Sequence, residues 1–257
     1  MPYAASGGAF TNVAGATTAV AGDIIQSAVW DNIHTDYGTA LTQVMQQLIS
    51  MTSYRNALYM NGSFEVWQRA QGASASQSVL ASTLSYTADR WYIQTGLDQD
   101  HVLSSIAGLS NAGARAIQIL RTAGEAGATA MVFAYPLDTD EIVKLRGSKV
   151  SFSCLAKAGA TWSPTNGTLV ATLYCGTGAS PAKRNATPYA GETSAFAIST
   201  NLTPGASSAT TITGDSSAVI PVTTTQAEVQ FSWTPIGAAG ATDLIALDDV
   251  QIEPQLS

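Results

Sequence analysis

Short runs of apolar or alternating residues fill the chain from residue 57 to residue 257, separated by clusters of Gly, Pro, Ser, Asn and Thr. Runs of this kind are typical of β-strands joined by turns, and they predict a mostly β body built as a two-sheet sandwich. The alternation is clearest at residues 227–234, where every second side chain is apolar. We expect one set of side chains to face the core and the other to face solvent. The core set is Ala227, Val229, Phe231 and Trp233, and the solvent set is Glu228, Gln230, Ser232 and Thr234.

Residues 23–56 follow a different period. Large side chains recur there at alternating intervals of four and three residues, which is the heptad spacing of a helix with one apolar stripe. Asp23 or Ser27 is suited to cap this helix at its start. The positions of this seam are Trp30, His34, Tyr37, Leu41, Val44, Leu48 and Met51.

The seam has two interpretations. In the first, helices of several chains pack along it and form an oligomerising stalk; in the second, the stripe packs on the body of its own chain. Gly38 weakens the helix by up to about 1 kcal/mol, so burial of the seam has to stabilise it in either case. His34 either meets its copies near the axis of a stalk or lies on the surface of a frayed first turn.

Residues 1–22 carry almost no charge and few large apolar side chains. Such a segment cannot form a core of its own, so we expect a floppy tail or an extended arm that is ordered only against a partner. It has no Lys or Arg before an apolar run, so we expect no signal peptide, and synthesis and folding in a cytoplasm. Cys154 and Cys175 then fit two buried thiols in strands, with a disulfide as the alternative.

Composition and charge exclude several classes of function. Acidic residues outnumber basic ones by 18 to 11, which gives a net charge of −7 and argues against nucleic-acid binding through a basic patch. Only 11% of the residues are charged, yet no apolar stretch is long enough to cross a membrane as a helix. The 46% of hydrophobic residues suffice for a sizeable core.

Catalysis is not expected. The chain has two histidines, no G-x-S-x-G elbow, no phosphate-binding glycine loop and no zinc-ligand spacing. Close carboxylates occur at residues 98–100, 138–141 and 248–249. The first two groups lie in segments that we interpret as turns, where carboxylates usually face solvent. We therefore expect a protein that is not an enzyme.

Loop aromatics are the best candidates for a glycan-binding platform, because sugar rings stack on exposed aromatic faces. Trp162 in GATWSPTNGT is the first candidate, followed by Tyr189 in TPYAGE and by Tyr174. The alternative for each is a ring that folds back and covers one end of the sandwich. Trp67 and Trp91 lie beside apolar neighbours in strand-like runs, and we assign them to the core.

Two sequence blocks resemble the opening of a family of fibre and virion proteins from tailed bacteriophages. That family reads NG-x-F-x-x-WQR and then YTADRW, and the chain matches it at residues 61–69 and 86–91. The N-terminal stretch at 21–41 is similar to the attachment arm and helix that precede such domains. The run SKVSFSCLAKAG together with LDDVQIEP at 247–254 is similar to the jelly roll of carbohydrate-binding modules.

The resemblance implies a virion appendage, either a tail fibre or a head fibre or spike. Residues 1–22 would dock on other virion proteins, and residues 23–56 would form a homotrimeric stalk. Residues 57–257 would form a jelly-roll β-sandwich that binds a host-surface glycan or decorates the particle. A stand-alone carbohydrate-binding module is the alternative, and a glycan depolymerase comes after it.

The resemblance also implies a structural calcium ion between the first and last strands of the sandwich. By analogy with those modules, Glu65 would lie against Asp248 or Asp249, and their carboxylate oxygens suit Ca²⁺. The alternative is that Glu65 faces solvent and that Asp249 accepts backbone N–H bonds at the end of the sheet. Separately, Arg69 and Arg90 with Asp89 are interpreted as a buried ion pair that locks the two blocks.

Overall fold

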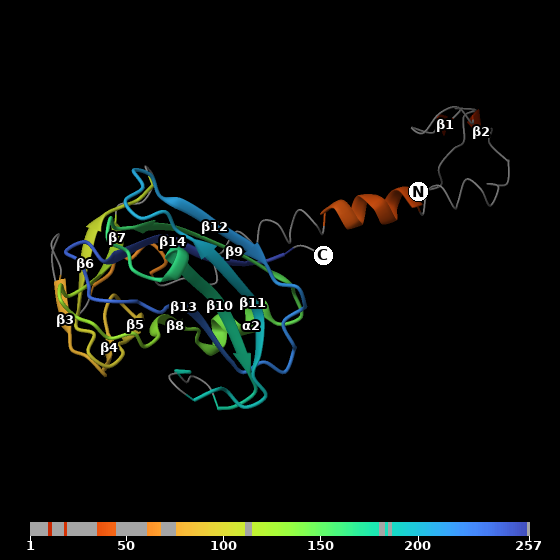
Figure 1. Ribbon diagram of the computed structural model, residues 1–257. Coiled ribbons are helices and arrows are strands. Elements are labelled where there is room, and N and C mark those ends of the chain that lie inside the picture. The colour runs from red at the N-terminus through yellow and green to blue at the C-terminus, as the bar shows by residue number, and fades with distance from the viewer. Residues whose placement is uncertain are drawn as a thin grey trace. The chain divides into compact units, whose positions relative to one another are not determined.

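The computed structural model describes residues 10–11, 18–19, 35–44, 61–67, 76–110, 115–179, 183–184 and 187–255. The chain divides into two compact units, Met1–Thr52 and Ser53–Ser257. In the first unit, β1 (Phe10–Thr11) pairs antiparallel with β2 (Thr18–Ala19), and a helix covers residues 35–44 (Figure 1).

The helix over residues 35–44 lies inside the segment expected to be helical. Three seam residues fall within it, and their side chains are exposed: Tyr37 by 74%, Leu41 by 62% and Val44 by 59%. Exposed apolar residues at this spacing form one stripe along a helix. The other seam positions lie outside the described residues, so the length of the seam and the oligomeric state stay predictions; these positions are Trp30, His34, Leu48 and Met51.

The second unit is a sandwich of two six-stranded antiparallel sheets, as the sequence pattern predicts (Figure 1). Its elements are β3 (Ser76–Val79), β4 (Leu84–Tyr86), β5 (Tyr92–Gln94), β6 (His101–Ala107), β7 (Arg115–Arg121), β8 (Met131–Pro136), α2 (Thr139–Leu145), β9 (Val150–Ala158), η1 (Thr165–Gly167), β10 (Thr168–Gly176), β11 (Thr193–Asn201), β12 (Thr210–Asp215), β13 (Gln226–Trp233) and β14 (Leu244–Pro254). The β10 sheet has the order β11-β10-β13-β8-β5-β4, and the β9 sheet has the order β12-β9-β14-β7-β6-β3. The chain changes sheet at each step from β8 to β10 and from β12 to β14, as in a jelly roll.

Aromatic rings fill the space between the sheets. The Trp91 ring is fully buried and stacks on Phe133 with 4.8 Å between centroids. Phe152 of the β9 sheet meets Phe231 of the β10 sheet at 6.1 Å. Trp91 is therefore a core residue as predicted, and so are Trp67 and Trp233.

Cys154 and Cys175 are free, buried thiols, which confirms the first of the two alternatives. They lie on β9 and β10, in different sheets. Burial raises the pKa of both thiols, that of Cys175 to about 12, so neither is an activated nucleophile.

The two family-like blocks meet in space. The Asn61 side chain donates to the Val66 carbonyl and accepts from the Val66 N–H, at 2.7 and 2.9 Å. The indole of Trp91 donates to the Asn61 carbonyl at 3.2 Å, and the Asp89 N–H donates to the Val66 carbonyl at 3.0 Å. The motif residues thus hold the start of the sandwich together, which is a structural role.

Arg90 has other partners than the sequence suggested. Its guanidinium forms ion pairs with Asp138 at 3.2 Å and with Glu141 at 3.1 Å, and Arg69 lies outside the described residues. The interpretation of residues 138–141 as a turn is wrong, because Asp138 caps α2. Asp138 accepts from the Glu141 N–H while the Glu141 side chain accepts from the Asp138 N–H, a capping box. Arg90 therefore joins the second block to this helix.

Candidate functional site

Part of the outward side of β13 is buried, although its polar residues were expected in solvent. Ser232 is half-buried, and Thr234, just after the strand, is exposed as predicted. Glu228 is 0% exposed and Gln230 is 3% exposed. The apolar residues between them point into the core as predicted. Alternation along one strand identifies its two faces, but it does not reveal that another segment covers the polar one.

Strand pairing places these two residues among tyrosines and a threonine. Tyr92 on β5 pairs with Ala134, Ala134 pairs with Gln230, and Gln230 pairs with Thr172 on β10. Two residues earlier on β13, on the same face, Glu228 pairs with Tyr174. We call this group the outer polar face; it consists of Tyr92, Thr172, Tyr174, Glu228 and Gln230.

Glu228 lies at the centre of the outer polar face. One carboxylate oxygen accepts hydrogen bonds from the Tyr92 hydroxyl at 2.7 Å and from the Gln230 amide at 2.6 Å. The other accepts from the backbone N–H of Arg184 at 3.0 Å. Burial raises the pKa of Glu228, and these hydrogen bonds oppose that shift. The buried carboxylate thus needs hydrogen-bond donors, which can belong to the chain or to a ligand.

Arg184 covers the tyrosine at the β10 edge of this face. Its guanidinium lies 3.7 Å from the centroid of the Tyr174 ring. Glu192 holds the guanidinium with two hydrogen bonds, both of 2.7 Å, in a planar two-point geometry. These bonds lower the pKa of Glu192, because they favour its charged form.

Lys183 covers the opposite tyrosines. Its ammonium lies 4.2 Å from the ring centroid of Tyr86 and 5.8 Å from that of Tyr92. Tyr86 and Tyr92 pair across β4 and β5, with their rings edge to face at 6.4 Å. Both cations therefore lie on rings that border the outer polar face.

A pocket opens at the other end of the same side of the sheet. Its volume is about 260 Å³, slightly below the roughly 300 Å³ at which drug-sized sites begin. The pocket is lined by Val170 and Ser232, which pair across β10 and β13. This pair lies two residues along the strands from the pair of Thr172 and Gln230. Thr165, Thr168, Thr234 and the exposed Ile236 also line the pocket. The outer side of the β10 sheet thus combines a covered polar centre with an open end.

Two of the expected platform residues are buried, so the expectation of exposed rings is wrong for them. Trp162 is 6% exposed, packs on Trp233 at 5.8 Å and donates from its indole to the Gly167 carbonyl at 3.1 Å. Tyr189 is also 6% exposed and packs against Gly176. A Cβ atom at position 176 would lie only 2.4 Å from the Tyr189 Cβ, so glycine is needed there. Trp162 thus packs into the core, as in the stated alternative. Tyr189 instead lies on the outer side of the β10 sheet, where Glu228, Arg184 and Glu192 act on its hydroxyl.

Tyr174 is a predicted platform residue that belongs to the outer polar face, and it is half-buried. Tyr189, also predicted, lies next to this face and is buried. The sequence did not point to Tyr92, Glu228, Gln230, Arg184 or Glu192 as site residues. The signal for two of them was present, since Glu228 and Gln230 alternate with core residues, but it was assigned to a solvated face.

The residues proposed for calcium do not fit such a site. Asp248 accepts from the N–H groups of Leu109 and Asp249, at 2.7 and 2.8 Å. Asp249 accepts from the hydroxyls of Ser63 and Ser110, at 3.2 and 2.9 Å. Glu65 is exposed, and no group of three or more metal-ligating His, Cys, Asp or Glu side chains occurs in the described part of the chain. Protein donors already use the oxygens that would bind the ion.

The first block and the last strand do meet, as the calcium hypothesis required. The N–H of Val250 donates to the Gly62 carbonyl at 3.0 Å, and Ser63 donates to Asp249. Direct hydrogen bonds therefore join the two ends of the sandwich where a bridging ion was expected.

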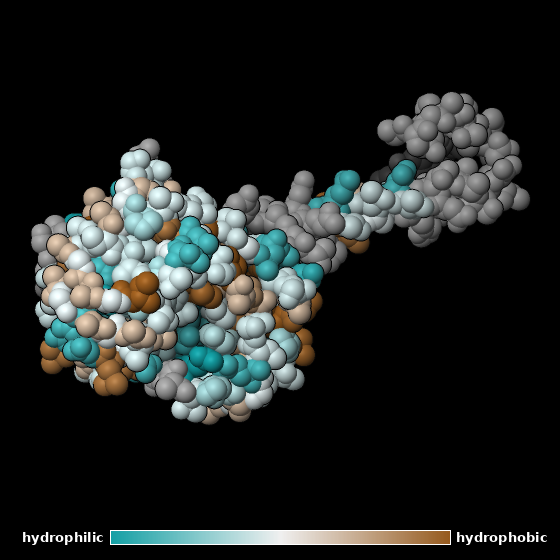
Figure 2. Space-filling model, viewed as in Figure 1, coloured by the Kyte–Doolittle hydropathy of each residue, from teal (hydrophilic) through white to brown (hydrophobic). Residues whose placement is uncertain are grey.

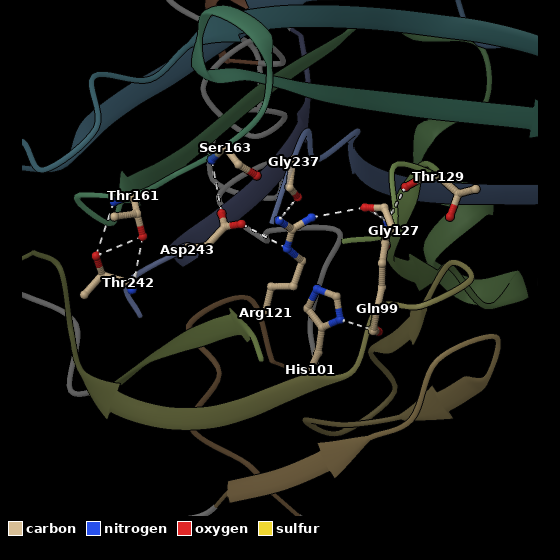
Figure 3. A network of polar contacts seen from close by, with 10 residues as sticks. All are labelled: Gln99, His101, Arg121, Gly127, Thr129, Thr161, Ser163, Gly237, Thr242 and Asp243. Carbon is tan, nitrogen blue, oxygen red and sulfur yellow. Dashed lines mark hydrogen bonds and ion pairs between the residues drawn. The ribbon is translucent and has the colours of Figure 1, made fainter. Parts of the chain in front are cut away.

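A second buried polar cluster lies among the loops beside β6, β7 and β14, and Figure 3 shows it at close range. Arg121 forms an ion pair with Asp243 at 3.0 Å, and both side chains are almost fully buried. The guanidinium also donates to the carbonyls of Gly127 and Gly237, at 3.1 and 2.7 Å. His101 lies below Arg121 in this view, and its Nδ1 is 2.8 Å from the Gln99 carbonyl (Figure 3). We call these residues the loop lock.

Figure 2 shows one side of the molecule, on which pale, weakly polar residues predominate and strongly hydrophilic residues gather in separate groups. Among the described helices, none is both long and apolar enough to span a membrane.

Comparisons with known proteins give structural likenesses only. No known family model matches the chain, and no curated protein matches it. Among solved structures, the chain is similar to a CBM4 carbohydrate-binding module, with 18% identity, a TM-score of 0.38 and coverage of 76% of this chain and 98% of that one. It is also similar to the enzymatically active domain of tailspike protein 4 from bacteriophage CBA120, with 12% identity, a TM-score of 0.40 and coverage of 79% and 22%. A cyclase from Fischerella sp. gives 12% identity, a TM-score of 0.45 and coverage of 76% and 94%. At this degree of overlap the likenesses assign neither a family nor an activity.

Proposed function

We propose that the chain is a non-catalytic bacteriophage virion appendage whose sandwich binds a host-surface glycan through the outer polar face. The observation that carries the glycan proposal is the buried arrangement of Glu228 and Gln230 between Tyr92 and Tyr174. Carboxylate and amide groups bind sugar hydroxyls, and flanking aromatic rings stack on sugar faces. A face of this composition on the outer side of a sheet is therefore suited to a glycan once it is uncovered.

The virion part of the proposal rests on the sequence. The blocks at residues 61–69 and 86–91 resemble phage fibre proteins, and the heptad seam suits a homotrimeric stalk. Residues 1–22 would dock the appendage on the particle. Either a tail fibre or a short head fibre or spike agrees with these features, and assembly would take place in the host cytoplasm.

The glycan site is tested on a printed array of oligosaccharides with Gln230→Ala. Gln230 orients Glu228, and its amide would also bind a sugar hydroxyl. Its loss should weaken binding roughly tenfold, since a hydrogen bond is worth about 0.5–1.5 kcal/mol. Gln251→Ala is the matched control, because Gln251 is an exposed glutamine on the β9 sheet. Equal loss in both variants, or unchanged binding by Gln230→Ala, would place the site elsewhere.

The stalk is tested with the double variant Leu41→Asp and Val44→Asp. Both side chains are exposed in the single chain, so charges there should leave the sandwich folded. If seams of three chains pack together, burying these charges is costly and the native mass should fall from trimer to monomer in light scattering. A monomeric wild-type chain would instead support the stand-alone carbohydrate-binding module.

A further inference from the structure

We propose that Lys183 and Arg184 are an intramolecular occupant of the outer polar face, and that a glycan binds there only after these two side chains leave the tyrosine rings. We call Lys183, Arg184 and Glu192 the clasp. The inference rests on the proposed function and names the regulation of the same site.

The clasp occupies the positions that a sugar would use. Arg184 lies at van der Waals distance from the Tyr174 ring, and Lys183 lies on Tyr86 and near Tyr92. A ring that already carries a cation on one face cannot stack a sugar on that face. Both aromatic borders of the site are thus covered by residues adjacent in sequence.

The backbone N–H of Arg184 also takes a hydrogen-bonding position that a ligand could use. The Arg184 N–H donates to the Glu228 oxygen that does not contact Tyr92, at 3.0 Å. A sugar hydroxyl is a donor of the same kind, so it would compete for this buried oxygen. The clasp therefore satisfies the polar centre of the site as well as its aromatic borders.

Glu192 sets the strength of the clasp. It binds the Arg184 guanidinium at two points and also accepts from the Tyr189 N–H at 2.8 Å. The Arg184 and Glu192 side chains are 19% and 17% exposed, so water and salt reach the pair. An equilibrium between covered and open sites reduces the apparent glycan affinity by the fraction of open molecules. Loosening the clasp should therefore strengthen binding.

The experiment compares the full-length wild type with Glu192→Gln and Arg184→Ala. Glu125→Gln is the matched control, since Glu125 lies in a loop after β7 and its backbone hydrogen-bonds with Thr122 and Ala239, not with the clasp. Binding to the printed oligosaccharide array is measured at low and high NaCl. We expect both clasp variants to bind about tenfold more tightly than wild type at low salt, and wild-type binding to tighten as salt rises. The control should behave like wild type.

Hydrogen exchange of the Arg184 amide gives an independent readout, because its bond to Glu228 should protect it in wild type and less in Glu192→Gln. A glycan that binds wild type and Glu192→Gln equally overturns the clasp and leaves the glycan site standing. An unprotected Arg184 amide in wild type overturns the clasp without reference to any ligand. Absence of binding by all variants overturns the proposed function, and the inference with it.

Discussion

The loop lock and the outer polar face are both buried clusters of polar side chains, but they neutralise charge differently. In the loop lock, Arg121 and Asp243 form an ion pair, and two backbone carbonyls accept hydrogen bonds from the other guanidinium nitrogens. In the outer polar face, the Glu228 carboxylate accepts from three neutral donors. One of those donors is the backbone of Arg184, which belongs to a covering segment.

This difference in bonding indicates which cluster can exchange a hydrogen-bond partner for a ligand. Removing one member of an ion pair inside a protein leaves an uncompensated buried charge, so the loop lock has to stay closed. A carboxylate with neutral hydrogen-bond donors can accept a hydroxyl in place of an N–H at small cost. The loop lock therefore suits a role in stability, and the outer polar face suits the proposed role in binding.

The largest expected effect comes from breaking the loop lock with Asp243→Ala. The variant leaves the Arg121 charge buried without its carboxylate, and the N–H of Ser163 also loses an acceptor at 3.1 Å. We expect a loss of about 3–5 kcal/mol in the free energy of unfolding, measured by urea denaturation. Asp140→Ala, at an exposed position in α2, is the control and should change stability by less than about 1 kcal/mol.

The double variant Arg121→Met with Asp243→Leu sharpens the same test. Two apolar side chains leave no buried charge, so most of the lost stability should return. A loss below about 1 kcal/mol in Asp243→Ala would contradict the assignment of the loop lock.

A smaller effect is expected from pH. Burial lowers the pKa of His101 to about 4, and the nearby Arg121 charge acts in the same direction, while the hydrogen bond to Gln99 opposes it. The unfolded state binds a proton near pH 6.5 and the folded state does not, so this contribution is complete above pH 6.5. It is lost as the pH falls from 6.5 towards 4, by up to about 3 kcal/mol.

His101→Gln isolates that contribution, since it keeps a donor for the Gln99 carbonyl and does not titrate. The difference in unfolding free energy between wild type and variant should shrink as the pH falls from 7 to 4. Glu141, Glu228 and Asp248 have raised pKa values and act with the opposite sign, but both proteins contain them. A difference that is constant over this range would show that His101 is not held neutral by the fold.

The smallest expected effect on stability is that of Glu228→Gln in the outer polar face. The amide keeps an oxygen for the Tyr92 and Gln230 donors and removes a charge from a buried position. The Arg184 N–H and a sugar hydroxyl both lose the acceptor oxygen for which they would compete. We expect a change below about 1 kcal/mol in urea denaturation, together with weaker glycan binding on the array. A loss as large as that of Asp243→Ala would make the two clusters equivalent, and the outer polar face structural.

The alternation of apolar residues determined the two-sheet sandwich and the inward direction of Val229, Phe231 and Trp233. It also placed Trp67, Trp91 and both cysteines in the core. Heptad spacing predicted a helix, and residues 35–44 are helical. These results follow from the periods of strands and helices, which are properties of a segment and its immediate neighbours.

Tertiary structure alone decided which polar residues are covered. The burial of Glu228 and Gln230, the closure of Trp162 onto Trp233 and the pairing of Arg90 with Asp138 and Glu141 depend on segments distant in sequence. A local pattern distinguishes the two faces of a strand, because side chains alternate. What packs against the outer face is set by the path of a loop and by the long-range contacts it makes, and the alternation contains no information about either.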